Sequence, residues 1–368
     1  MLGSERQSRI RWSSRALAGL GMAAISAMLL TSCTAEDLAP SSGSGADGEQ
    51  RTLVVTSFGG SFDEALEETV VQPFEAEHNV DVQLVTALTN DAMATVRAQG
   101  ANSGYDVIQF SGNQETEAFD LGLIEPVDTS IVTNAADVVD SAVRADGEIA
   151  PSWGFDATGI LYNTEKVEAP TTWEALADPA FQGRVALPDI SATHGQNLII
   201  SLARINGGSE ADTESAFAEL PKYAENSQSV YTNGATMTQL FEQDQADLAV
   251  WGGGFTYLLA EQQGLPVGFA IPEDGTVLYG LSSQAVAGGE NTDLAFEWIN
   301  FQLDPEIQAA FAEAAGYAPS NEQVELSADL EQRLPLSTVL DKLQTADVEA
   351  VANNRASWVE SWNRILGQ

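Results

Sequence analysis

Short apolar runs alternate with amphipathic stretches along most of this chain, and polar or glycine-rich turns separate them. The first three apolar runs are Thr52 to Phe58, Val80 to Thr86 and Tyr105 to Phe110. Runs of this length, rich in β-branched residues, predict buried strands, and the spacing of apolar residues between them predicts helices. Strands that alternate with helices indicate an α/β fold built on helix-flanked, parallel sheets.

The turn after the first strand is a candidate ligand-binding loop. Gly59 and Gly60 end the strand, and Ser61 with Glu64 has the spacing of a capping box for a helix whose apolar face includes Phe62. Such a turn offers backbone N–H groups to a ligand. A plain strand-to-helix turn is the alternative, and on the motif alone it is favoured.

A second candidate loop follows the third strand and contains Ser111 and Gly112. In open α/β sheets, ligands bind beyond the carboxyl ends of the strands. We therefore expect this loop and the loop from Gly59 to Phe62 to face the same site.

The stretch from Trp153 to Asn163 is interpreted as a crossover strand between two lobes. The alternation of strands and helices runs up to this stretch and starts again after it. A crossover strand lies beside the cleft between lobes, so Trp153 and Asp156 are candidate cleft residues.

The second half offers a further loop, from Pro188 to Gly195, which contains Ser191 and His194. A polar surface histidine is the favoured alternative for His194, since one imidazole without a partner indicates nothing specific. We keep both residues as candidates because a loop in this position can face the cleft.

Trp251 ends another predicted strand and is followed by three glycines, of which Gly253 and Gly254 are candidate site residues. Core packing is the alternative for an aromatic residue at a strand end. For Trp251 we favour ligand contact, because glycines beside it leave one face of the ring open. For Tyr279, in the extended segment from Val277 to Ala287, the two alternatives are equal.

The N-terminus predicts export. Basic residues precede an uncharged stretch from Ala16 to Ser32, which is too short for a membrane span and has the features of a secretory signal. The sequence that ends in Cys33 resembles the lipobox of bacterial lipoproteins, which implies lipid attachment to that cysteine. Residues 33–50 have the composition of a flexible tether.

Charge and cysteine content narrow the function. The chain has 54 acidic and 15 basic residues, a net charge of -39, which argues against nucleic acid and anionic lipid surfaces as partners. Cys33 is its only cysteine, so no internal disulfide forms. With two histidines and no nucleophile or phosphate-binding motif, we expect a protein without enzymatic activity, cofactor or metal.

Several segments together resemble the solute-binding proteins of bacterial ABC importers, in the spermidine/putrescine-binding branch. They are Trp153 to Asn163, Thr172–Trp173, Phe181 to Val185, Asp247 to Trp251, Ile299 to Phe301 and Gly316 to Ser320. The resemblance implies a type II periplasmic-binding-protein fold with two lobes and two crossover strands. It further implies a monomer that binds a small solute and delivers it to a membrane permease. The expected lobes are 51–152 with about 272–315, and 153–271 with about 316–368.

The resemblance also implies four acidic residues that hold a polyamine. In this chain an ungapped comparison places Ser61, Ser191 or Ala192, Gly254 and approximately Leu281 at those positions. A buried ammonium group without such partners is costly. We therefore expect a small polar organic solute with at most one positive charge, and Asp156 as the carboxylate best placed to meet it.

Two alternatives remain at this point. A secreted hydrolase that uses a pair of carboxylates is compatible with so acidic a sequence. An anchored sensor that binds the same solute differs from an importer component only in the partner it contacts.

Overall fold

The computed structural model describes residues 50–112, 114–334 and 343–367. The predicted signal peptide, Cys33 and nearly all of the tether lie outside these residues, as does most of the helix expected around Leu336 to Leu343. The described strands are β1 (Thr52–Ser57), β2 (Asp81–Thr86), β3 (Val107–Ser111), β4 (Gly154–Asn163), β5 (Val185–Pro188), β6 (Ser227–Tyr231), β7 (Leu248–Gly252), β8 (Val267–Ala270), β9 (Val277–Ala285), β10 (Ala318–Pro319) and β11 (Gln344–Thr345).

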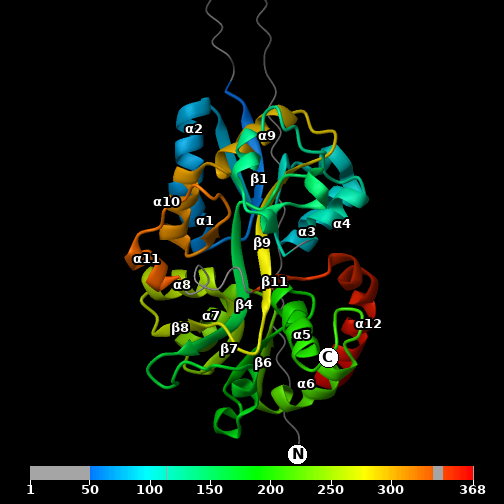
Figure 1. The fold of residues 1–368 in the computed structure, drawn as a ribbon, viewed down its shortest axis with the longest axis vertical. Coiled ribbons are helices and arrows are strands. Elements are labelled where there is room, and N and C mark those ends of the chain that lie inside the picture. The colour runs from blue at the N-terminus through cyan, green and yellow to red at the C-terminus, as the bar shows by residue number, and fades with distance from the viewer. Residues whose placement is uncertain (1–49, 113, 335–342, 368) are drawn as a thin grey trace, which may run out of the picture. The chain divides into compact units, whose positions relative to one another are not determined.

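Helices connect most of these strands and flank them (Figure 1). They are α1 (Ser61–Leu66), α2 (Gln72–His78), α3 (Thr89–Gln99), α4 (Glu115–Asp120), α5 (Thr193–Ile205), α6 (Glu214–Asn226), α7 (Gly234–Glu242), α8 (Gly253–Glu261), α9 (Thr292–Gln302), α10 (Pro305–Ala315), α11 (Ala328–Arg333) and α12 (Val348–Leu366). A π-helical turn, Glu67–Val71, joins α1 to α2.

The strands form one mixed sheet in the order β2-β1-β3-β9-β4-β7-β5-β6. β1 pairs in parallel with β2 and β3, and β5 pairs in parallel with β6 and β7. We call β2, β1 and β3 the first half of the sheet and β7, β5 and β6 the second half. The α/β class is confirmed, and the expected parallel pairing holds within each half, whereas β4 and β9 run antiparallel to their neighbours.

Two long strands, β4 and β9, lie between the two halves and connect them. β4 pairs with β9 over Gly154–Ala157 and with β7 over Thr158–Tyr162, and the other edge of β9 pairs with β3. Figure 1 shows β4 and β9 running side by side through the middle of the sheet. Their side chains are almost all buried, and these include polar ones such as Asp156 and Gln284. The predicted crossover at residues 153–163 is therefore a strand shared by the two halves.

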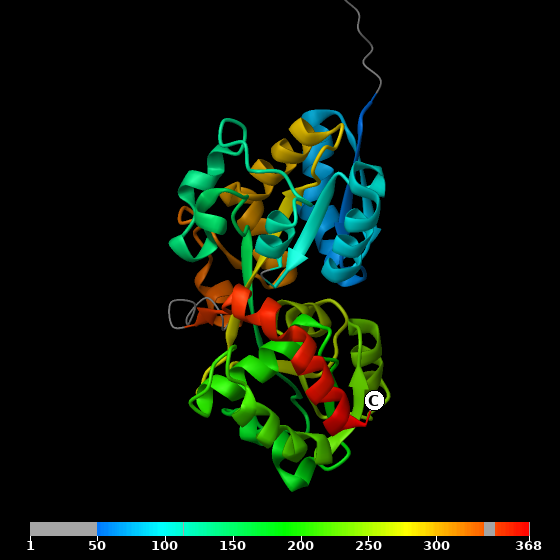
Figure 2. The same cartoon turned by 90° about the vertical axis from the view of Figure 1, so that its right-hand side faces the viewer.

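Each half has a hydrophobic core of its own. The first core is built on β1, α1, α9 and α10, and it includes Trp153, Phe311 and Tyr317. The core beside β5 and β7 includes Trp173, together with Trp358 and Trp362 from α12. Figure 2 shows α12 lying along the second half, where it packs against α6, and one end of it approaches α4.

The structure differs in two further places from the sequence-based expectation. α1 begins at Ser61 itself, with Gly60 as its N-cap and no side-chain cap, so the expected capping box is wrong. Asp63 holds the turn before α1 instead, since its Oδ1 accepts hydrogen bonds from the Gly59 amide and the Ser57 hydroxyl. The segment α6–β6–α7 was not predicted.

Candidate ligand-binding site

A cavity of about 770 Å³, called here the large cavity, lies at the carboxyl ends of strands from both halves of the sheet. Its volume falls within the range that suits a small organic ligand. The loops after β1, β2 and β3 line one side, and the loops after β5 and β6 together with the end of β7 line the other. The lining residues are Phe58–Ser61, Thr86, Leu88–Asp91, Ser111, Gln114, Ser191–His194, Tyr231–Ala235, Thr238, Glu242, Trp251, Phe255, Gln263, Tyr279 and Tyr317.

The glycine turn after β1 enters this lining because of its backbone conformation. Gly59 and Gly60 have φ values of 81° and 59°, which glycine adopts without strain. The turn places Ser61 at the start of α1, where its Oγ accepts a hydrogen bond of 2.9 Å from Nε2 of Gln263. Asp63 faces the backbone of the turn, and it is not among the lining residues.

Direct hydrogen bonds join the loops on the two sides of the large cavity. The Thr193 hydroxyl donates to the Ser111 carbonyl oxygen at 2.9 Å, and Asn90 Nδ2 donates to the Ser191 carbonyl oxygen at 3.2 Å. Ser111 thus contributes its backbone oxygen to this contact. The two sides are held close by neutral groups.

Aromatic rings cluster on the side formed by the second half. The centroid of Trp251 lies 4.7 Å from that of His194, 5.3 Å from Tyr231 and 5.4 Å from Phe255. The Tyr279 ring lies 5.7 Å from His194 in an edge arrangement. Such a wall provides apolar surface and π faces for a ligand.

His194 is half-buried in this wall. Burial lowers its pKa to about 3, so the imidazole is neutral at physiological pH. Its Nδ1 lies 3.1 Å from Oγ1 of Thr158, which also accepts a hydrogen bond of 2.9 Å from Asn197 Nδ2. Thr158 Oγ1 and Nδ1 of His194 are thus hydrogen-bond partners within the wall. His194 is thus a neutral member of the wall and not the free surface histidine that was the favoured alternative.

Charged side chains are scarce in the large cavity. Among the described lining residues the only acids are Asp91 and Glu242, both exposed, and no lysine or arginine takes part. The remaining polar groups are hydroxyls, amides and the neutral imidazole. The cavity is therefore suited to a ligand that carries little net charge.

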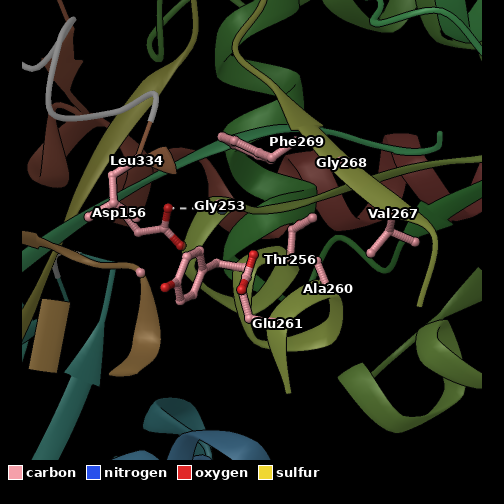
Figure 3. Close-up of a pocket in the computed structure, with 11 residues that line it drawn as sticks. Asp156, Gly253, Thr256, Ala260, Glu261, Val267, Gly268, Phe269 and Leu334 are labelled. Carbon is pink, nitrogen blue, oxygen red and sulfur yellow. Dashed lines mark hydrogen bonds between the residues drawn. The ribbon is translucent and has the colours of Figure 1, made fainter. Parts of the chain in front are cut away.

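Asp156 lies behind the aromatic wall and not in the large cavity. It lines a smaller cavity of about 230 Å³ with Gly253, Phe269 and other residues, which we call the small cavity (Figure 3). Its Oδ1 accepts from the amides of Ala157 (2.7 Å) and Gly253 (2.9 Å), and Oδ2 accepts from the Tyr279 hydroxyl (2.8 Å) and the Gly254 amide (3.2 Å). Burial raises the pKa of Asp156 to about 6, although these four hydrogen bonds lower it.

Eight of the fourteen ligand-binding candidates line the large cavity: Gly59, Gly60, Ser61, Ser111, Ser191, His194, Trp251 and Tyr279. The other six are placed elsewhere. Phe62 and Trp153 are buried in the first core, and Asp156 and Gly253 line the small cavity. Gly254 packs so closely on Tyr317 that an added Cβ would lie 2.5 Å from that ring, and Gly112 would meet Gln114 in the same way at 2.8 Å.

Other lining residues were not found from the sequence. Tyr231, Asn233 and Phe255 are examples from the second half. A signal was present, because Ser227–Tyr231 followed by Asn233 and Gly234 repeats the strand, glycine turn and helix that marked the loop after β1.

The described residues contain neither a cluster of metal-ligating side chains nor a membrane-spanning helix. No group of three or more His, Cys, Asp or Glu side chains in these residues is arranged to hold a metal ion. Within the same residues, every helix is too short or too polar to span a bilayer.

Comparison with known proteins adds a family. The sequence profile described as bacterial extracellular solute-binding protein matches residues 69–335. The spermidine/putrescine-binding periplasmic protein of Escherichia coli (strain K12) is 23% identical over 260 residues, which is 68% of this chain and 74% of that protein.

Two solved structures share the fold. One is an ABC transporter protein from Clostridium perfringens ATCC 13124, with a TM-score of 0.68, 26% identity and coverage of 85% of this chain and 99% of the other. The second is the periplasmic binding protein AgtB from Agrobacterium tumefaciens R10 in complex with agropinic acid. Its TM-score is 0.73 at 22% identity, and the match covers 87% of this chain and 100% of that one.

Proposed function

This chain belongs to the family of bacterial extracellular solute-binding proteins, with a type II periplasmic-binding-protein fold, and we propose that it binds its solute in the large cavity. As a solute-binding protein of an ABC importer it has a receptor role and not an enzymatic one. The observation that carries the proposal is that loops from both halves of the sheet converge on one cavity at the ends of their strands. A ligand there touches both halves. Because the ligand binds the closed form more tightly, it favours closing of the two halves around itself.

We infer that the solute is a small polar organic molecule with at most one positive charge. Two exposed acids, Asp91 and Glu242, are the only charged side chains among the described lining residues. A polyamine carries several ammonium groups, and each one loses several kcal/mol of hydration when buried without a partner. Hydroxyls, amides and aromatic faces instead suit a neutral or zwitterionic solute such as an amino-acid-derived or opine-like compound.

The positions at which acids were expected support the same inference. Ser61 and Ser191 line the large cavity with hydroxyl groups. Gly254 lies against Tyr317, and Leu281 is fully buried in the first core. None of the four positions therefore offers a carboxylate to the large cavity.

We also propose that the two halves of the sheet are the two lobes, with β4 and β9 as the crossover strands. The first lobe takes residues 51–152 with about 272–319, a few residues beyond the expected boundary at about 315, and the second takes 153–271 with the C-terminal segment that contains α12. Residues Tyr317 and Ala318 pack in the first core, which supports a boundary just after β10. A lipid on Cys33 and a tether up to residue 50 would keep the monomer beside its membrane permease.

A thermal-shift screen of the purified protein tests the ligand class. Spermidine, putrescine, agropinic acid, single amino acids, aminophosphonates, sugars and ferric iron form the panel. A compound at one hundred times its Kd adds about 2.7 kcal/mol to the unfolding free energy. We expect a hit among the neutral or zwitterionic compounds, and tight binding of spermidine would contradict the inference.

A further inference from the structure

Asp156 occupies the place where β4 changes its partner. Its backbone pairs with Tyr279 on β9, and two residues later Thr158 pairs with Gly252 on β7. The side chain is 1% exposed and lies opposite the first turn of α8. One carboxylate is thus placed between both shared strands and the start of a helix.

The hydrogen bonds of this carboxylate reach two elements of the aromatic wall. Its Oδ2 accepts from the hydroxyl of Tyr279, whose ring lines the large cavity. Its two oxygens also accept from the amides of Gly253 and Gly254, which follow Trp251 by two and three residues. Figure 3 shows the carboxylate directed at Gly253.

Gly252 shows how closely these groups converge. A Cβ added to it would lie 2.6 Å from Oδ2 of Asp156, 2.6 Å from the Tyr279 hydroxyl and 3.2 Å from Cε1 of His194. Only a residue without a side chain fits between the carboxylate behind the wall and the ring in front of it. The carboxylate of Asp156 and the rings of Tyr279 and His194 are therefore packed closely around Gly252.

We propose that Asp156 is a positioning residue, whose ionised carboxylate fixes Trp251 and Tyr279 from behind and makes the shape of the aromatic wall dependent on that charge. The inference rests on the proposed function, because it concerns the wall of the same ligand site. An ionised carboxylate accepts all four hydrogen bonds. A protonated one carries a donor on one oxygen, so the contacts with Tyr279 and the α8 amides weaken.

The groups around Asp156 do not hold its carboxyl in one charge state over the ordinary range of pH. The titratable groups near it are Tyr279 on β9, Tyr317 beside β10, His194 on α5, and Tyr257 and Glu261 on α8. No lysine or arginine among the described residues that line the small cavity compensates its charge. Because burial raises its pKa to about 6, the carboxyl changes charge between neutral and mildly acidic conditions.

The first test needs no ligand. In nitrogen-15 NMR spectra, the Gly253 and Gly254 amides and the Trp251 indole should titrate together between pH 8 and pH 4.5, and Asp156→Asn should abolish this shared titration. Asp274→Asn is the matched control, since Asp274 is another carboxyl whose pKa is raised by burial but it contacts the Trp173 amide, away from the wall. If the Trp251 indole does not follow the two amides, the proposal is wrong.

The second test uses agropinic acid and putrescine as probes at pH 7.5 and pH 5. For either compound that binds, we expect the affinity of the wild type to fall at least fivefold at the lower pH, and the affinity of Asp156→Asn to be weak and independent of pH. A flat wild-type profile with a weakened Asp156→Asn would indicate a purely structural role and overturn the proposal. Should neither probe bind, the proposed function loses support, while the titration of Trp251 still decides the role of Asp156.

Discussion

The Thr193 hydroxyl and the Ser111 carbonyl oxygen form a hydrogen bond of 2.9 Å that joins the start of α5 to the end of β3. Asn90 and Ser191 make a second contact of this kind, and Gln263 and Ser61 make a third. All three link opposite sides of the large cavity through neutral groups. We interpret them as contacts of the closed form proposed above, and their contribution can be measured directly.

Replacing Thr193 by Val removes the donor at nearly constant volume. A neutral hydrogen bond contributes about 1 kcal/mol, so the closed form should lose about fivefold in population relative to an open one. Small-angle X-ray scattering should report a larger radius of gyration, and the affinity for a screened ligand should fall by a similar factor. Thr193→Ser keeps the hydroxyl and should behave as the wild type. Equal radii for Thr193→Val and the wild type would contradict this interpretation of the contact.

Asp156 should also alter the pH dependence of stability. Its pKa of about 6 in the folded protein lies above the value of 3.8 for an unburied Asp, so between these values the folded state binds more protons than the unfolded state. Its contribution to the unfolding free energy is therefore present at low pH and is lost as the pH rises through 6. Relative to Asp156→Asn, the wild type should be more stable at pH 4 than at pH 7 by about 2 kcal/mol.

Urea denaturation of both proteins at several pH values measures this difference. Asp244, Asp247 and Asp293 have lowered pKa values because of hydrogen bonds to Lys166, Arg184 and Arg51, and they destabilise the fold in acid. Their effect is common to both proteins and cancels in the comparison. A difference that does not change with pH would show that folding leaves the pKa of Asp156 unshifted.

Much of the fold follows from local patterns in the sequence. The apolar runs of β1, β3 and β7 and the glycine turn after β1 depend on neighbouring residues, so the sequence locates them to within about two residues. The antiparallel direction of β9 depends on how distant segments pack, and periodicity carries no information about it. The same limitation applies to β6, whose side chains are only partly buried and show no apolar run.

The site was predictable where loops follow strands and less so where a side chain has two possible faces. Ser61 and Ser111 were placed correctly at the strand ends because topology alone puts them there. Asp156 sits on a crossover strand as expected, yet its orientation depends on the α8 amides and Tyr279, which come from segments about 100 residues away. Its direct contact with a positive ligand group stays a prediction, and the hydrogen bonds support an indirect role.

Salt should stabilise this protein. A net charge of -39 makes the folded chain repel itself, and the Debye length falls from about 30 Å at 0.01 M salt to about 3 Å at 1 M. The unfolding free energy in potassium chloride should therefore rise steadily over this range. Sucrose at matched osmolality serves as the control, because it does not screen charge. Stability that stays constant with salt would show that repulsion between the acidic side chains does not limit the fold.

The buried ion pair between Arg144 and Glu115 offers a test of how the loop after β3 is held. Arg144 Nε lies 2.8 Å from Glu115 Oε1, and its Nη1 donates to the carbonyl oxygens of Ser141 and Val143. Glu115 is 1% exposed and begins α4, directly after Gln114 of the large cavity. Burial raises the pKa of Glu115, and the charge of Arg144 opposes that rise.

Arg144→Met should destabilise the protein by about 3 to 5 kcal/mol at neutral pH, since it leaves a buried carboxylate without its partner. The loss should shrink on acidification, because Glu115 then becomes neutral. Adding Glu115→Gln to Arg144→Met removes the unpaired charge and should recover most of the stability. Urea denaturation of the two single variants and the double variant gives the coupling energy. If the double variant is as unstable as Arg144→Met alone, the loss comes from packing around Arg144 and not from its charge.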